Sequence, residues 1–327
     1  MSIYAVPKEV FMHLHPSRFR VLLLLLTLLF VLSSCNGPSA PSTESITLTD
    51  ALGRSVTLPG RPQRVAALIG SFADLWLLAG GSLCAAAEDA WEDFGLTLED
   101  TVNIGGAHSP SLELLVASDP ELVLASASTA SHVELEEALT SMGIPVVYFD
   151  VDHFEDYLAM LKTCTDLTGR SDLYEINGLA LRANIEAIKQ DFQNAALPES
   201  RRKILLLRTS SSSVKAKGSR GTILGEMLAD MGCINIADSD STLLENLSLE
   251  AILRADPHHV FVVTMGSDTE KAMASLELMI SENPAWQGLA AIRENRLHLM
   301  DKTLFNMKPN VRWAEAYQIL YETLIQE

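Results

Sequence analysis

The segment SLELLVASDPELVL, Ser111 to Leu124, is followed 137 positions later by SLEAILRADPHHVFV, Ser248 to Val262. Ser, Leu, Glu, Asp and Pro stand in register in the two copies. In each copy an apolar stretch with helical spacing follows the Glu, Asp-Pro ends it, and a short β-branched or leucine-rich run predicts a buried strand. The chain contains the same unit twice, which predicts two similar lobes with a ligand cleft between them.

The same order of elements surrounds each copy of the repeat. In the first half we predict strands at 64–69, 83–87, 122–125 and 145–149, with helices at 72–79, after Ser111, and at 132–142. In the second half we predict strands at 203–208, 233–237, 260–264 and 296–300, with helices at 223–231, after Ser248, and at 269–280. Because strands alternate with helices, each half is expected to form a parallel sheet covered on both faces. The fold class is therefore α/β, with two Rossmann-like lobes.

A long helix is predicted to join the two lobes. Residues 154–168 and 171–196 both have helical spacing, interrupted at Gly169, and the second stretch carries an apolar stripe. We place the N-terminal lobe at 46–170, the connecting helix at 171–196 and the C-terminal lobe at 201–327. A single helical connection indicates a stiff strut that limits hinge closure.

The amino terminus has the pattern of a secretory signal. Three basic residues precede a leucine-rich stretch at 21–32, which is short for a membrane span of about 20 apolar residues. The tetrapeptide Leu32-Ser33-Ser34-Cys35 resembles the lipobox at which bacterial lipoproteins are cleaved and acylated. We predict a signal peptide at 1–34, lipidation of Cys35 and a flexible tether at 35–45, which is rich in Pro, Ser and Gly. The alternative is a signal anchor with an incidental cysteine.

The chain is strongly acidic. Its formal charge is −18, and removal of residues 1–34, with three basic residues and one acid, makes it −20. Nucleic acid is disfavoured as a partner because phosphate binding needs a basic surface.

The remaining cysteines, Cys84, Cys164 and Cys233, are odd in number and lie in apolar sequence. We expect buried thiols instead of a disulfide framework, although a bridge between two of them stays open.

Several motifs, in order, carry a family resemblance over residues 46–327. They are Asp50-Ala-Leu-Gly53-Arg54, Pro62-Gln-Arg64-Val65, Asn103-Ile-Gly-Gly106 with Ser111-Leu-Glu113, Asp119-Pro-Glu-Leu-Val123, Asn283-Pro-Ala-Trp286, and Lys308-Pro-Asn with Arg312-Trp313. In this order they resemble the ABC-transporter substrate-binding proteins for ferric siderophores, haem and cobalamin, the class with one rigid inter-domain helix. His258-His259 departs from the plainer residues that the family usually has there.

The resemblance implies a partner and a docking mode. In this family one Glu on each lobe docks into arginine-bearing pockets of the permease dimer, and those positions fall on Glu113 and Glu250. Two carboxylates at a fixed separation suit charge-assisted contacts with Arg. Ser111 and Ser248 also predict helix caps, and an acid in the first turn favours the helix dipole, so both roles are compatible. We expect a monomer that works with a permease dimer and its cytoplasmic ATPase.

Histidines that follow strands are candidates for the cleft, because ligands of α/β sheets bind outside the carboxyl ends of the strands. His108, His132 and His153 meet this criterion and are candidates to ligate a metal or the metal of a macrocycle; the alternative is a polar loop or cap role for each. His258 and His259 precede their strand, so we expect them at the surface away from the ligand.

Aromatic and basic loop residues complete the set of ligand candidates. Phe72, Trp91 and Phe94 are candidates to pack against a large ligand face. Positions 209–220 form the most basic stretch, and we predict a loop there whose cations attract carboxylate, catecholate or phosphate groups, the alternative being a solvated loop. The cationic and sulfur-bearing candidates are Lys215, Lys217, Arg220, Lys308 and Met265.

The sequence predicts a receptor without catalytic activity and without an intrinsic cofactor. Its cargo is expected to be an iron complex, with a ferric siderophore first and haem or a corrinoid as the alternative. A direct metal-ion receptor and a membrane-tethered hydrolase are the other hypotheses for the function. The hydrolase hypothesis has no support from a catalytic motif, since the sequence has no G-x-S-x-G elbow and no H-E-x-x-H helix.

Overall fold

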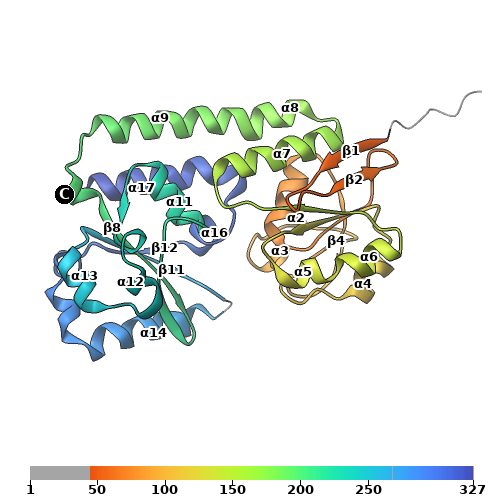
Figure 1. Ribbon diagram of the computed structural model, residues 1–327. Coiled ribbons are helices and arrows are strands. Elements are labelled where there is room, and N and C mark those ends of the chain that lie inside the picture. The colour runs from red at the N-terminus through yellow and green to blue at the C-terminus, as the bar shows by residue number, and fades with distance from the viewer. Residues whose placement is uncertain (1–44, 267, 327) are drawn as a thin grey trace, which may run out of the picture. The chain divides into compact units, whose positions relative to one another are not determined.

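Two β-sheets, each flanked by helices, form the two lobes that the repeat predicts (Figure 1). The computed structural model describes residues 45–266 and 268–326. The predicted signal peptide and tether, with Cys35, lie outside the described residues. No helix in the described part of the chain is long and apolar enough to cross a membrane.

The N-terminal sheet is parallel throughout, with strand order β5-β4-β3-β6-β7. All five residues of its interior strand β6 are buried, as expected for a sheet covered on both faces. An antiparallel hairpin of β1 and β2 precedes it. The elements are β1 (Ile46–Thr49), β2 (Ser55–Leu58), β3 (Val65–Ala67), α2 (Gly70–Leu78), β4 (Leu83–Ala86), α3 (Asp89–Glu92), β5 (Val102–Asn103), α4 (Leu112–Ala117), β6 (Leu122–Ser126), α5 (Ala130–Glu134), α6 (Glu136–Ser141) and β7 (Val146–Phe149).

The C-terminal sheet has four parallel strands in the order β10-β8-β11-β12, with β9 antiparallel to β8. The prediction of a loop at 209–220 is therefore wrong in part, because Ser213 to Lys217 form a strand. The elements are α10 (Glu199–Arg202), β8 (Lys203–Ser210), β9 (Ser213–Lys217), α11 (Ile223–Asp230), β10 (Ile234–Asn235), η2 (Ile236–Asp238), α12 (Ser241–Asn246), α13 (Leu249–Ala255), β11 (His259–Thr264), α14 (Thr269–Glu282), η3 (Pro284–Gly288), α15 (Ala290–Arg293), β12 (Leu297–Met300), α16 (Lys302–Phe305), η4 (Asn310–Arg312) and α17 (Trp313–Ile325).

The two copies of the repeat fold alike at both ends of their helix. Ser111 Oγ accepts a hydrogen bond from the backbone N–H of Leu114 at the start of α4, and Ser248 Oγ accepts one from Ala251 at the start of α13. The Asp of each Asp-Pro pair has left-handed backbone, with φ of 50° at Asp119 and 45° at Asp256. Asp tolerates this conformation better than most residues, so it ends the helix where the sequence predicts.

The connection between the lobes follows α7 (Phe154–Thr168) and is helical from Ser171 to Asn194. It comprises α8 (Ser171–Tyr174), a π-helical turn η1 (Glu175–Leu179) and α9 (Ala180–Asn194). Figure 1 shows it running alongside α7 and α17. The turn η1 packs closely on α7, because a Cβ at Gly178 would lie 3.0 Å from Leu158.

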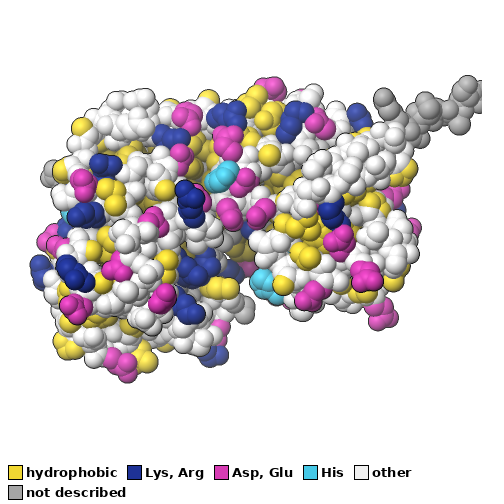
Figure 2. Space-filling model, in the orientation of Figure 1, with side chains coloured by type: hydrophobic (Ala, Val, Ile, Leu, Met, Phe, Trp, Pro, Cys, Tyr) yellow, Lys and Arg dark blue, Asp and Glu magenta, His cyan; other side chains and the backbone are white. Residues whose placement is uncertain are grey.

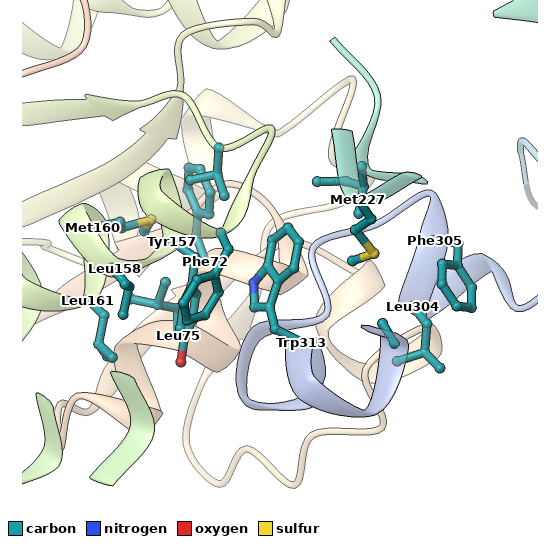
Figure 3. Close-up of a cluster of buried hydrophobic side chains, with 14 of the residues drawn as sticks. Phe72, Leu75, Tyr157, Leu158, Met160, Leu161, Met227, Leu304, Phe305 and Trp313 are labelled. Atoms are coloured by element: carbon teal, nitrogen blue, oxygen red, sulfur yellow. The ribbon is translucent and has the colours of Figure 1, made fainter. Parts of the chain in front are cut away.

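One hydrophobic core extends through both lobes. Trp313, the first residue of α17, is fully buried, and its ring centroid lies 5.8 Å from that of Phe154 and 6.4 Å from that of Tyr157, both on α7. Figure 3 shows Trp313 between N-lobe side chains such as Leu75 and C-lobe side chains such as Met227. The C-terminal helix therefore braces the connection that α8, η1 and α9 make.

The cysteines of the described residues are free thiols. Cys84 and Cys164 are buried and Cys233 is half-buried. Burial raises the pKa of Cys233 to about 12 and raises that of Cys164 well above its usual value.

Candidate functional site

A hollow separates the two lobes, and Figure 2 shows Lys and Arg side chains gathered on its C-terminal-lobe side. We call it the interlobe hollow. Charged residues that follow β4 and β7, that lie on β8, and that lie between α16 and η4 influence one another's pKa, so we assign these segments to the border of the hollow. This position agrees with the rule that α/β sheets bind ligands beyond the carboxyl ends of their strands.

The C-terminal-lobe wall carries three cations on one hairpin. Arg208 of β8 is paired in register with Lys215 of β9, and Lys217 lies two residues further along. Side chains paired across antiparallel strands lie on the same face of the sheet, so the three charges are grouped. Burial lowers the pKa of Lys217, and Arg208 and Lys215 lower it further.

Arg208 is the most deeply buried of these three cations. Burial lowers its pKa, and the charge of Asp152 across the hollow opposes that shift. Its Nε is buried and has no hydrogen-bond partner in the described part of the chain. The guanidinium as a whole is only half-buried, so its other N–H groups can donate charge-assisted hydrogen bonds to a ligand oxygen. From the sequence Arg208 is predicted only as the last residue of a strand, and the signal that marks it as a site residue is a cation at the carboxyl end of a strand.

The N-terminal-lobe wall is acidic. Asp150 and Asp152 follow β7, and Asp89 begins α3 after β4. Burial raises the pKa of Asp89 and of Asp152; a backbone hydrogen bond from Gly70 opposes the shift at Asp89, and Lys308 opposes it at Asp152. The Oδ1 atom of Asp89 is buried without a partner among the described residues. These three acids are not among the predicted site residues, because acidic side chains are common over the whole of this chain and carry no motif here.

Lys308 lies where the two walls meet. It is partly buried, and within residues 45–266 and 268–326 it makes no ion pair or hydrogen bond through its ammonium group. Burial lowers its pKa, while Asp152, Asp150 and Asp89 raise it. Its segment is held against the N-terminal lobe by the ion pair of Lys302 Nζ with Asp93 Oδ1, at 2.9 Å.

The other predicted ligand residues are spread over different environments. His108, Lys215, Arg220 and Met265 are exposed, and Trp91 and Phe94 are half-buried beside Asp89 in and after α3. His153 is exposed and caps α7, where its Nδ1 accepts a hydrogen bond from the backbone N–H of Asp156. His153 lines a separate cavity of about 350 Å³ between α7, α9, α11 and α17.

Two candidates and one surface residue lie in the core, contrary to the predictions. Phe72 is 1% exposed and packs edge-on against Phe149, at 6.0 Å between ring centroids. His132 is 0% exposed; its Nδ1 accepts from the backbone N–H of Ser126 and its Nε2 donates to the carbonyl of Ala107. We therefore leave Phe72 and His132 out of the candidate site.

His259, expected at the surface, is 1% exposed because it is already the first residue of the buried strand β11. Its Nδ1 lies 3.0 Å from His298 Nε2 on β12.

No group of three or more His, Cys, Asp or Glu side chains is arranged to hold a metal ion among the residues that the structure describes. The donors of the interlobe hollow instead suit hydrogen bonds and ion pairs to an organic ligand. Glu113 and Glu250 are exposed at matching positions in the first turns of α4 and α13.

A two-lobed α/β frame with a polar hollow between the lobes defines a solute-binding protein. The family model described as "Periplasmic binding protein" matches residues 65–304, and the chain belongs to this family. Its fold and its two lobes confirm the predicted fold class. The chain is a binding protein and not an enzyme, in keeping with its relatives.

Known relatives narrow the class. YhfQ of Bacillus subtilis, named as a candidate ABC transporter substrate-binding lipoprotein, is 21% identical over 310 residues, 90% of this chain and 93% of its own. The Fe(3+)-citrate-binding protein YfmC of Bacillus subtilis is 22% identical over 286 residues, 84% of either chain. The crystal structure of Staphylococcus aureus SirA complexed with staphyloferrin B superposes with a TM-score of 0.68 at 20% identity, covering 86% of this chain and 99% of SirA.

The predicted class is confirmed. The chain is a substrate-binding protein of an ABC importer, of the class that serves siderophores, haem or cobalamin.

Proposed function

We propose that this protein captures a ferric chelate, with a ferric siderophore as the leading candidate, in the interlobe hollow and delivers it to an ABC permease. The observation that carries the proposal is the group of Arg208, Lys215 and Lys217 on one hairpin, with the Nε of Arg208 buried and unpaired in the described residues. Ferric chelates present carboxylate, hydroxamate or catecholate oxygens, which accept charge-assisted hydrogen bonds from Arg and Lys.

The half-buried aromatic residues favour a ligand of some size. Trp91 and Phe94 follow Asp89 in the same segment, and each keeps part of its ring accessible. An apolar ring face beside charged groups suits a chelate with an organic backbone better than a bare ion.

Titration of the purified mature protein tests the proposal. Ferric citrate, ferrioxamine B, haem and cyanocobalamin are added separately while tryptophan fluorescence and the visible spectrum are recorded. We expect quenching by a ferric chelate at micromolar concentration. Binding of haem or cyanocobalamin alone would select the alternative cargo, and the absence of binding by all four would overturn the proposal.

We further propose that Glu113 and Glu250 dock the protein to its permease. The permease works with a cytoplasmic ATPase. Both carboxylates are exposed, occupy equivalent positions in the two copies of the repeat, and make no ion pair within residues 45–266 and 268–326. Such carboxylates are available to pair with arginines of a partner.

The predicted lipid anchor at Cys35 remains part of the proposal. The lipobox-like Leu32-Ser33-Ser34-Cys35 would hold the folded lobes outside the cytoplasmic membrane. Replacement of Cys35 with Ala should release the protein from the membrane fraction; equal membrane retention of the variant would contradict the anchor.

A further inference from the structure

The two walls of the interlobe hollow carry opposite charges. Arg208, Lys215 and Lys217 give the C-terminal-lobe wall three positive charges. On the other side Asp150 and Asp152 follow β7 and Asp89 begins α3 after β4, and all three carboxylates raise the pKa of Lys308, which lies between α16 and η4. Three carboxylates against one ammonium leave that side with a net charge of about −2, since carboxyl groups are ionised at neutral pH unless strongly perturbed.

Each wall also has a buried polar atom without a partner in the described residues. On the basic wall it is Nε of Arg208, a donor, and on the acidic wall it is Oδ1 of Asp89, an acceptor. Both atoms are covered by the protein, but the two side chains are only half-buried, so a ligand meets the remaining N–H donors of the Arg208 guanidinium and the other carboxylate oxygen of Asp89, an acceptor. An acceptor on the ligand fits Arg208, and a donor on the ligand fits Asp89.

A cargo that is anionic all round does not fit this arrangement. It would satisfy Arg208 but would place negative charge beside Asp89 and Asp152, where partial burial reduces screening by solvent.

We propose that the cargo is a dipolar ferric chelate. Its free carboxylate faces Arg208 and Lys217, and a protonated amine or another strong hydrogen-bond donor faces Asp89 and Asp152. The inference rests on the proposed function and names the chemical class of the chelate. The acidic wall thereby acts as a specificity determinant that rejects polyanionic complexes.

Three ferrioxamines with the same hydroxamate iron centre provide a direct test. Ferrioxamine B ends in an ammonium group, ferrioxamine D1 is its neutral N-acetyl form, and ferrioxamine G has both an ammonium and a carboxylate. Dissociation constants are measured by tryptophan quenching. We expect affinity to rise from D1 to B to G, by about fivefold or more at each step, a typical size for one charge-assisted contact.

Variants then assign each end of the ligand. Asp89→Asn and Asp152→Asn should remove the preference for B over D1, and Arg208→Gln and Lys217→Gln should remove the preference for G over B. Glu277→Gln and Lys271→Gln, on the exposed face of α14, are matched controls that should change nothing. Circular dichroism of each variant establishes that it is folded, and the paired variants keep the test valid if one of them is not.

A second arm uses ferric citrate, which carries no cationic group. Asp152→Asn should bind ferric citrate about threefold more tightly than the wild type, because one repulsive charge is gone. Equal affinity for B and D1, or tight binding of ferric citrate or haem without binding of ferrioxamine G, would overturn the dipolar cargo and leave the proposed function standing. Failure of every ferric complex to bind would overturn the proposed function itself.

Discussion

Asn310 Nδ2 donates a hydrogen bond of 2.8 Å to Asp74 Oδ2, and so joins the C-terminal segment to helix α2 of the first lobe. The same nitrogen donates to the carbonyl of Ser71, also at 2.8 Å. Asn310 is 1% exposed and has left-handed backbone with φ of 50°. Because Lys308 is only two residues away, this contact holds Lys308 at the junction of the two walls.

Replacement of Asn310 with Ala should destabilise the protein by about 2–3 kcal/mol, because it leaves the Asp74 carboxylate and the Ser71 carbonyl without their donor. The pKa of Asp74, which burial raises and the Asn310 bond lowers, should rise further. Urea unfolding measures the free energy. Asn306→Ala, a partly buried residue in the same segment, should be nearly neutral; equal losses in the two variants would contradict the role of the contact.

Any side chain at Gly81 is predicted to destabilise the protein, because the indole of Trp76 packs directly against this glycine. A Cβ at this position would lie 2.1 Å from Nε1 of Trp76, whose indole is buried and donates to the Ser82 carbonyl at 2.9 Å. Gly81→Ala should therefore cost about 1–3 kcal/mol, the usual range for an overpacked core. Gly106→Ala, whose Cβ would meet its first neighbour at 3.5 Å, is the control. Thermal unfolding should separate the two variants, and similar midpoints would refute this explanation.

His259 should make the C-terminal lobe sensitive to acid. Burial, followed by the charges of His258, His298, Arg296 and Arg201, lowers the pKa of His259 to about 3. An unfolded His has a pKa near 6.5, so the unfolded state binds the proton first. Its contribution to stability is intact above about pH 6.5 and is lost progressively down to about pH 3, by up to about 5 kcal/mol.

Urea unfolding at several pH values checks this prediction. The free energy of unfolding of the wild type should fall with pH across that window, and His259→Phe should flatten the fall. The Phe is expected to be accommodated because Phe261 and His298 already pack against the ring. A parallel pH dependence in wild type and variant would show that other groups are responsible.

Charge reversal at the docking residues should separate transport from binding. The double variant Glu113→Arg, Glu250→Arg should keep the dissociation constant for the ferric chelate, because neither residue is among the charged groups assigned to the interlobe hollow. It should lose uptake of radiolabelled iron into cells that rely on this protein, because arginines would face arginines. Glu277→Arg is the matched control. Normal uptake by the double variant would contradict docking through these carboxylates.

Much of the fold could be predicted because its signals are local. The repeat, the buried strand predicted at 122–125 and the helix predicted at 154–168 follow from periodicity and from Asp-Pro and Gly stops; β6 extends the strand by one residue and α7 spans the predicted residues. Strand β9 was not predicted because the run of serines at 210–213 favours a loop. The alternation of exposed Lys215 and buried Ala216 is too short to indicate a strand by itself. Pairing with β8, a tertiary effect, makes it a strand.

The candidate site was harder to predict because it depends on distance between loops. His132 follows a strand, as a cleft residue should, yet two backbone groups of its own lobe bind its ring nitrogens. Conversely, Asp89, Asp152 and Arg208 carry no motif. Only the folded chain shows that Asp89 and Asp152 lie close enough to Lys308 to raise its pKa, and that Asp152 does the same for Arg208.

Dissociation constants for variants of the interlobe hollow decide whether a ferric chelate binds against its basic wall. With ferrioxamine G, whose carboxylate is expected to face the basic wall, Arg208→Gln and Lys217→Gln should each weaken binding by about fivefold or more, equivalent to about 1 kcal/mol. Lys271→Gln on α14 should leave it unchanged. Unaltered affinity in both hollow variants would contradict the account, because the ligand would then lie elsewhere.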